Sequence, residues 1–313
     1  MTVIDIGVLS AGLTLAGGLA ALSLLAWFRH GRDPYFADDD SVLMPSPPSD
    51  FTPALASVVM HGSASRRTIF AGLMYLASRN LIAFRAEPFP VGHRAGLALT
   101  THRPHHLQAP APEAELYASI AAAMPASGYI AAIFLDSLND AFRAFTGSLD
   151  KLAVERGWLR ARPGPLIHKW RILAGVEALC GVLLAGWIAP LAGGPTGPSQ
   201  MSVAAVGFGA VVAGAVTFLV SGAMPARTAE GASLAAMLNA YRRTLKVTIA
   251  QADTVEQVVV MAPLPWVNDP TSEIAWAVAF GLDREIDSLL SQSLEVSESG
   301  GWPTGIRDWF SVF

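Results

Sequence analysis

The chain has 313 residues, of which 52% are hydrophobic and only 15% are charged, and its formal net charge is -4. Such a low charge content indicates a lipid-embedded fraction. The small net charge indicates neither a nucleic-acid coat nor an acidic tail, so any charge signal must be local. The single cysteine, Cys180, excludes a disulfide framework.

Three apolar stretches are long enough to cross a bilayer as helices. Residues 6–28 and 201–224 contain no internal charge and exceed the roughly 20 residues that a span needs. Residues 170–191 are also apolar, but they carry Arg171 at one end and Glu177 about two turns inside. We expect three transmembrane helices. The uncharged stretch 117–135 is broken by proline and glycine, so we interpret it as two short helices outside the membrane.

The basic residues give these spans one orientation. Asp5 is the only charge before the first span, whereas Arg29 and Arg32 follow it directly. Lys169 precedes the second span and Arg227 follows the third, while the loop between these two spans has no charge. Because Lys and Arg concentrate on the cytoplasmic side, the pattern predicts an outer N-terminus and a cytoplasmic C-terminus in a bacterial inner membrane.

A folded segment is predicted after a proline-rich linker. Thr52 precedes Pro53 as a helix N-cap, and this first short helix ends at Gly62. A second helix starts near Ser65, carries apolar residues at three- and four-residue spacing, and stops at Asn80 in a left-handed conformation.

The hydrophobic period then changes from helical to alternating. Residues 81–86 and 95–102 are predicted as two strands around a loop with Pro and Gly. Helix, turn, helix and hairpin in this order suggest a winged helix. Further helices are expected at 112–123 and about 135–155, followed by a short strand before the second span.

Two more helices are predicted after the third span. One begins at Thr228 with Leu238 and Tyr241 on its apolar face, and the other opens at Pro270 and runs to Leu289. We expect these helices to pack as a pair. The Ser- and Gly-rich segment after Glu295 is expected to be a flexible tail with an aromatic end.

The expected fold class is mainly α, with three transmembrane helices, a cytoplasmic winged-helix-like α+β domain and a C-terminal helical segment. The expected order is an outer tail (1–5), span one (6–28), a linker (29–49), the winged-helix-like domain (50–169), span two (170–191), an outer loop (192–200), span three (201–224), a cytoplasmic helical segment (225–295) and a flexible tail (296–313).

Seven short motifs together resemble the YciQ-like family of bacterial predicted membrane proteins, a domain family of unknown function. They are HGRDP at 30–34, PPSDFTPA at 47–54, LMYLASRNLIAF at 73–84, RGWL at 156–159, TAEG at 228–231, LPW at 264–266 and AFGL at 279–282. The resemblance implies this architecture, but no activity and no catalytic residues. Family members usually carry an extracytoplasmic β-rich domain before the first span, which we expect this chain to lack.

Arg66, Arg67 and Arg79 belong to a locally basic segment, 61–106. In a winged helix they suit a phosphate-binding face, but a surface that contacts lipid headgroups or a protein is the favoured interpretation.

His102, His105 and His106 form H-x-x-H-H, a pattern that suits zinc or nickel. No neighbouring Cys, Asp or Glu completes a first shell, so we favour solvated histidines and predict no metal and no cofactor.

Glu177 is the strongest single candidate, because an ionisable group inside a bilayer is costly. A packing role against Ser23 or Ser221 is favoured over ion or proton transport.

No nucleophile elbow, HExxH helix or kinase signature is present. The leading hypothesis is therefore a non-enzymatic membrane scaffold or regulatory subunit that binds a protein partner. The alternatives are a membrane-tethered DNA-binding regulator and an accessory subunit of a transport or channel assembly.

Overall fold

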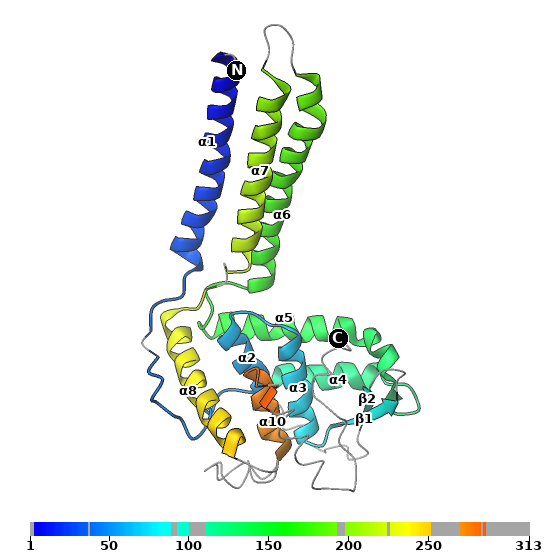
Figure 1. Cartoon of the computed structure of the whole chain (residues 1–313). Helices are drawn as coiled ribbons and strands as arrows, with labels where there is room; N and C mark the ends of the chain where they lie inside the picture. The colour runs from blue at the N-terminus through cyan, green and yellow to red at the C-terminus, as the bar shows by residue number, and fades with distance from the viewer. Residues whose placement is uncertain are drawn as a thin grey trace. The chain divides into compact units, whose positions relative to one another are not determined.

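The chain forms two compact units, each built from two separate segments (Figure 1). The computed structural model describes residues 3–36, 38–88, 93–99, 110–192, 198–223, 226–251, 270–282 and 284–285. The membrane unit comprises residues 1–34 and 159–228, and the second unit comprises residues 35–158 and 229–313. The protein is mainly helical in both units.

Three helices of the membrane unit are long and apolar enough to cross a bilayer. They are α1 (Val3–Ala26) with its π-helical extension η1 (Trp27–Gly31), α6 (Pro163–Leu183) with η3 (Leu184–Ile188) and η4 (Ala189–Leu191), and α7 (Gln200–Ser221). All three predicted spans are confirmed as candidate membrane helices. Helix α6 begins earlier than predicted, because Pro163 suits the first turn, where an N–H would have no helical partner.

Small residues let these helices approach closely. A Cβ added to Gly207 of α7 would lie 2.6 Å from the carbonyl oxygen of Gly181 in α6, and one added to Gly12 of α1 would meet the Val206 side chain at 2.2 Å. Gly209 of α7 likewise faces Ala16 of α1. Glycines in the GFGAVVAG run at 207–214 therefore serve helix packing.

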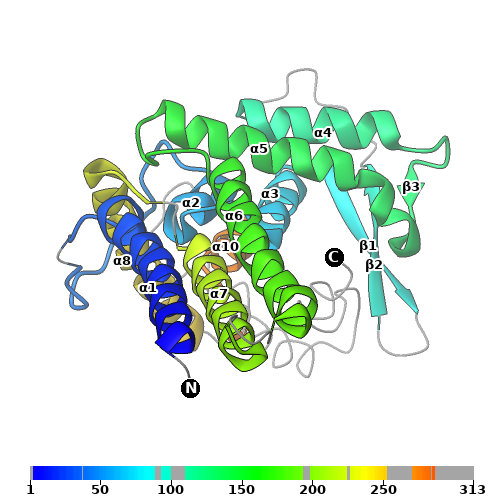
Figure 2. The same ribbon diagram turned by 90° about the horizontal axis from the view of Figure 1, so that it is seen from above.

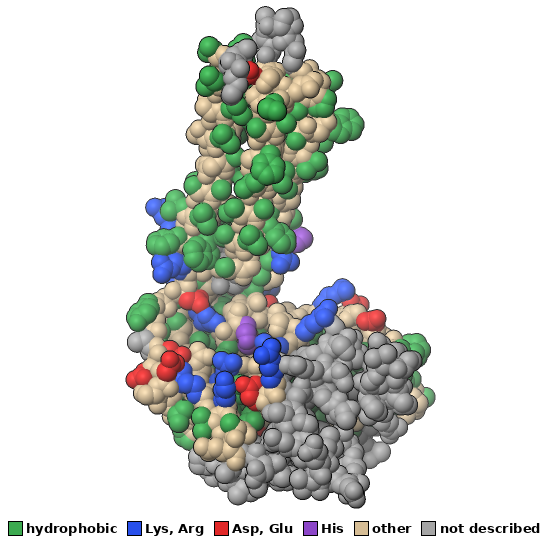
Figure 3. Space-filling model, in the orientation of Figure 1, with side chains coloured by type: hydrophobic (Ala, Val, Ile, Leu, Met, Phe, Trp, Pro, Cys, Tyr) green, Lys and Arg blue, Asp and Glu red, His purple; other side chains and the backbone are tan. Residues whose placement is uncertain are grey.

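The surface of the membrane unit is apolar along its sides (Figure 3). Leu15, Phe208 and Leu219 are 66%, 70% and 76% exposed. In water such exposure would be unfavourable for three parallel helices, whereas lipid tails solvate it.

The ends of the helices nearest the basic residues are tied together within this unit. Asp33 accepts hydrogen bonds from the backbone N–H and the guanidinium of Arg227. Arg227 also forms an isolated β-bridge with Leu159, and the Arg160 N–H donates to the Ala226 carbonyl at 3.0 Å. The short strand predicted before the second span is thus reduced to one bridge.

The second unit combines helices with a small sheet. Its elements are α2 (Pro53–His61), α3 (Arg66–Ser78), β1 (Ile82–Pro88), β2 (His93–Leu99), α4 (Ala111–Ala123), β3 (Tyr129–Ile130), the 3-10 helix η2 (Ala132–Leu138), α5 (Asn139–Glu155), α8 (Ala229–Gln251) and α10 (Pro270–Ala279). Figure 2 shows α4 and α5 side by side, with β1, β2 and β3 at one end of the unit. The predicted order of helix, turn, helix and hairpin is present in α2, α3, β1 and β2.

The ends of α2 and α3 follow the predicted capping signals. The Thr52 hydroxyl accepts from the Leu55 N–H at 3.2 Å, and Gly62 ends α2 with φ 74°. Ser65 opens α3 in a capping box. Asn80 has φ 57°, and its neighbour Leu81 donates its N–H to the Leu76 carbonyl at 3.0 Å, which closes α3 in a Schellman motif.

The sheet has the order β1-β2-β3 and is antiparallel throughout. Ile82 pairs with Leu99 and Pro88 with His93, so the hairpin is in register along seven residue pairs. Strand β3 pairs Ile130 with Leu97 and was not predicted, because two residues carry no readable alternation. The stretch 117–135 contains parts of α4 and η2 and no span, as predicted.

The C-terminal pair of helices differs from the prediction in two ways. Helix α10 ends at Ala279 rather than near Leu289, because Gly281 takes φ 71° and the Leu282 N–H returns to the Ala277 carbonyl at 2.9 Å. Furthermore, α10 lies mainly against α3 and α2, and it reaches α8 through the side chain of Tyr241. The residues after 285, including the predicted tail, lie outside the described part.

The linker before α2 is fastened to α8 by one arginine. Arg243 Nη2 lies 2.9 Å from Asp38 Oδ1 and donates to the Asp39 carbonyl at the same distance, while Arg243 Nε donates to the Val42 carbonyl at 3.2 Å. Asp39 turns its carboxylate to Ser41, whose hydrogen bonds lower the pKa of Asp39. Residues 38–42 of the linker are therefore held against α8 within the second unit.

Candidate functional site

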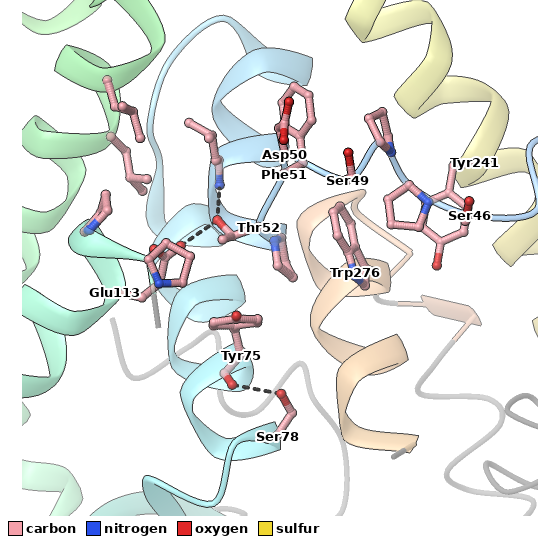
Figure 4. A pocket seen from close by; sticks show the side chains of 18 of the residues that line it. Ser46, Ser49, Asp50, Phe51, Thr52, Tyr75, Ser78, Glu113, Tyr241 and Trp276 are labelled. Carbon is pink, nitrogen blue, oxygen red and sulfur yellow. Dashed lines mark hydrogen bonds between the residues drawn. The ribbon is translucent and has the colours of Figure 1, made fainter. Parts of the chain in front are cut away.

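A pocket of about 870 Å³ opens in the second unit (Figure 4). Its walls come from the linker, α2, α3, α4, α5, α8 and α10, which are distant from one another in sequence. Its polar and aromatic lining residues are Ser46, Ser49, Asp50, Phe51, Thr52, Tyr75, Ser78, Arg79, Glu113, Arg156, Tyr241, Glu273 and Trp276. This volume lies within the roughly 300–1,000 Å³ that is usual for small-molecule sites.

One wall holds a buried carboxyl group on Glu113. Glu113 lies in the first turn of α4 and is 0% exposed. The Thr52 hydroxyl, which already accepts from the first turn of α2, donates its proton to Glu113 Oε1 at 2.5 Å. Glu113 Oε2 is buried and has no hydrogen-bond partner among the described residues. Burial raises the pKa of Glu113, and the Thr52 hydrogen bond opposes that rise only in part.

A second wall holds Glu273, which is 3% exposed in the first turn of α10. The Tyr241 hydroxyl donates to Glu273 Oε2 at 3.1 Å, whereas Oε1 has no partner within the described ranges. Burial raises the pKa of Glu273 to about 7. It also raises the pKa of Tyr241, with the Glu273 charge adding to the effect. Trp276 and Phe280 contact the Tyr241 ring edge-on, with centroids 5.7 Å away, and fix its position.

Two exposed arginines line the same pocket, and each lies over an aromatic ring. The Arg79 guanidinium is 5.3 Å from the Tyr75 ring centroid and donates to the Tyr75 hydroxyl at 3.3 Å. The Arg156 guanidinium is 5.0 Å from the ring centroid of Trp158 and donates to the Asp50 carbonyl at 3.2 Å. Stacking leaves most of their N–H groups available for an anion.

The three predicted arginines do not form one surface. Arg66 and Arg67 begin α3, and Arg67 lies beside Gly281, where an added Cβ would be 3.1 Å from its Cζ. Arg79 is the C-cap of the same helix. Thirteen residues of helix separate the two ends by about 20 Å. Only Arg79 belongs to the pocket.

Glu177 joins a hydrogen-bonded chain across all three spans. The Thr217 hydroxyl of α7 donates to Glu177 Oε2 at 2.8 Å. It also lies 2.9 Å from Ser23 Oγ of α1, so Ser23 donates to Thr217. Glu177 is 8% exposed, and the two hydroxyl residues are 3% and 0% exposed. Ser23, one of the two predicted partners, thus reaches Glu177 through Thr217, whereas Ser221 donates back to the Phe218 carbonyl of its own helix.

The predicted histidine candidates His102, His105 and His106 lie outside the described residues. Among the residues that are described, no group of three or more His, Cys, Asp or Glu side chains could hold a metal ion.

Sequence reasoning missed Glu113, Glu273, Tyr241, Arg156 and Trp276 as pocket residues. Each has an ordinary local explanation: an acid in the first turn of a helix complements the helix dipole, and an aromatic residue at helical spacing belongs to a core. Their convergence depends on the packing of α4, α8 and α10, for which the sequence of one chain carries no direct signal.

The comparisons with known proteins identify the family and nothing finer. No curated protein and no solved structure matches the chain. Residues 44–286 match the family described as "Predicted membrane protein (DUF2207) C-terminal domain". The match covers both segments of the second unit and two of the three membrane helices, so the chain belongs to the DUF2207 family of predicted membrane proteins.

Proposed function

We propose that the chain is a non-enzymatic membrane scaffold or regulatory subunit, which presents its second unit to a protein partner. The proposal rests on two adjacent exposed apolar residues in the 3-10 helix η2. Ile133 and Phe134 are 56% and 63% exposed, although Leu135 and Leu138 of the same short helix are buried at 3% and 0%. Adjacent exposed apolar side chains beside a well-packed core are typical of an interaction surface.

The charges around this pair favour a protein over a lipid surface. Asp136 is exposed directly beside the pair, and the Asp140 side chain is 95% exposed one turn further on. Asp140 lies 3.4 Å from the exposed Arg143 guanidinium, so the negative charge beside the pair comes mainly from Asp136. Anionic headgroups would repel this carboxylate, whereas a partner with an apolar centre and a basic rim would complement it.

We interpret α2, α3, β1 and β2 as a winged-helix-like module that binds protein. DNA binding remains the weaker alternative, because a recognition helix must present an exposed face to the major groove. No residue of α3 from Thr68 to Ser78 is exposed, since other helices of the unit cover its sides. The basic residues at its two ends are also too far apart for one contact.

The proposal includes the orientation in the membrane. An inner-membrane location with an outer N-terminus and a cytoplasmic second unit is supported by Arg29 and Arg32 at one end of span one and by Asp5 at the other. Within its family we assign the chain to the YciQ-like proteins, on the seven motifs that resemble them.

An accessory role in a transport or channel assembly is the remaining alternative. Among the described residues, the buried Glu177 in the second span is the feature that favours this role. Both hydroxyls of the three-helix chain act as donors toward Glu177, an arrangement that suits helix packing at least as well as proton transfer.

The test is affinity purification of the full chain in mild detergent after cross-linking in cells, with quantitative mass spectrometry. Phe134→Glu places a charge in the apolar pair and should lower the recovery of a reproducible partner at least tenfold. Val247→Glu is the matched control, because Val247 is an apolar residue that is 45% exposed on α8, away from η2, and this variant should keep the partner. Recovery of the wild-type chain without any reproducible partner, or equal recovery from both variants, would overturn the proposal.

A further inference from the structure

We propose that the pocket of the second unit binds a phosphorylated heteroaromatic compound, for which a purine nucleotide is the simplest probe. This ligand site goes beyond the proposed scaffold function, because neither Ile133 nor Phe134 lines the pocket. Ligand binding in the pocket and partner binding at η2 can therefore be lost separately.

Glu113 Oε2 and Glu273 Oε1 are buried in the pocket walls without a hydrogen-bond partner among the described residues. Buried polar atoms in folded proteins are nearly always paired, so two such atoms around one cavity indicate that a bound molecule completes them. The molecule must carry hydrogen-bonding groups at more than one position, a donor for an unprotonated carboxyl oxygen and an acceptor for a protonated one. The edge of a purine base provides them.

The pocket walls also carry aromatic rings. Figure 4 shows the ring of Tyr75 on α3 and that of Trp276 on α10. Both residues line the pocket, and each is fixed by its own contacts, Tyr75 by Arg79 and Trp276 by Tyr241. Rigid aromatic rings in the wall of a pocket suit a planar ring system, because every base has a face that stacks.

Two exposed arginines give the pocket a positive charge. Arg79 and Arg156 are exposed, line the pocket and keep free N–H groups, so they attract phosphate. They would repel a lysine or arginine side chain that approached the carboxyl groups. The raised pKa values of Glu113 and Glu273 agree, because a neutral carboxyl can both donate to and accept from a neutral base edge. The ligand is therefore anionic at one end and neutral and planar at the other.

The experiment is isothermal titration of the detergent-solubilised full chain with GTP, ATP, guanosine and inorganic phosphate as separate probes. At least one nucleotide should bind. Arg79→Gln and Arg156→Gln should weaken nucleotide binding roughly 10- to 100-fold, as expected when a charge-assisted hydrogen bond is lost. They should leave guanosine almost unaffected. Glu273→Gln should weaken nucleotide and guanosine alike.

The matched control is Arg143→Gln, because Arg143 is exposed on α5 and does not line the pocket. The arginine variants alter exposed residues, and an unfolding curve for each verifies the fold. Three results would overturn the proposal: no nucleotide binds the folded chain, Arg143→Gln weakens binding as much as Arg79→Gln, or inorganic phosphate binds as tightly as a nucleotide. Unchanged nucleotide binding by Phe134→Glu would support a site separate from the scaffold surface.

Discussion

Two phenylalanines show how differently the two units are built. Phe145 of α5 is 2% exposed in the second unit, whereas Phe208 of α7 is 70% exposed in the membrane unit. In the second unit the large apolar side chains form the core. In the membrane unit they lie outside, and the buried positions are taken mostly by Gly, Ala, Ser and Thr, with one aspartate and one glutamate.

This inversion follows from the solvent of each unit. Lipid tails are as apolar as leucine, so the membrane helices gain little from burying such side chains against one another. They gain instead from close backbone approach and from hydrogen bonds such as Thr217 to Glu177. The second unit depends on the hydrophobic effect, and its polar interior is restricted to a few hydroxyl and carboxyl groups.

The largest test of this comparison is Phe145→Ala paired with Phe208→Ala. Phe145 packs against Gly72 of α3, where an added Cβ would be 2.7 Å from its Cζ, so truncation leaves a cavity in the core. We expect a loss of about 3–5 kcal/mol in the unfolding free energy of the second unit. Phe208→Ala should change the unfolding free energy of the membrane unit by less than about 0.5 kcal/mol, because Phe208 faces lipid. Hydrogen exchange of peptides from α3 and α7 measures both. Equal losses would contradict the inversion.

The second test uses the buried carboxyl group of Glu273. Its pKa is raised from the ordinary value of 4.5 to about 7, so the folded chain holds this proton more tightly than the unfolded chain. The resulting stability is complete below pH 4.5 and is lost as the pH rises through about 7, for a total of up to about 3 kcal/mol.

The check is denaturant unfolding at several values between pH 4.5 and 8. Glu273→Gln should reduce the loss of stability with rising pH. The amide oxygen of the glutamine still accepts from Tyr241, but the side chain has no proton to lose in this range. Glu113 contributes a decline of the same sign that the variant retains. If the wild type becomes more stable as the pH rises over this range, the assigned direction of the pKa shift is wrong.

The smallest expected effect lies in the membrane unit. Thr217→Val keeps the shape of the side chain but removes the hydroxyl that joins Ser23 to Glu177. Hydrogen bonds between membrane helices average about 0.6 kcal/mol, so we expect a loss of about 0.5–2 kcal/mol in detergent unfolding. Thr14→Val is the control, because its hydroxyl bonds only to Ser10 of its own helix. A loss above 3 kcal/mol would mean that the polar chain, rather than glycine contacts, holds the spans together.

Features that depend on a few neighbouring residues could be predicted from the sequence. Thr52, Gly62 and Asn80 were expected as helix ends, and each takes the predicted role, because caps and left-handed stops are local. The three spans were equally clear, since length and hydropathy alone decide them. Gly281 was the missed exception: the apolar spacing continues past it, and its positive φ was not recognised as a stop.

Features that depend on tertiary packing could not be predicted. The first-turn positions of Glu113 and Glu273 are typical of exposed acids, yet both are buried when α4 and α10 pack around the pocket. The main neighbours of α10 were also not predicted, because it lies mostly against α3 and α2 and meets α8 through Tyr241. Thr217 escaped notice because a hydroxyl in a span is common, and only its position opposite Glu177 makes it important.

One glycine of the second unit, Gly231, can be used to recognise homologues with the same local structure. A Cβ added to Gly231 at the start of α8 would lie 2.0 Å from the Trp158 carbonyl oxygen and 2.9 Å from its carbonyl carbon. Backbone atoms cannot rotate away as a side chain can, so the position admits only glycine. It joins the TAEG and RGWL motifs, which are far apart in sequence. A glycine at the position equivalent to 231 therefore offers a simple filter for judging, from sequence alone, which distant homologues retain this junction.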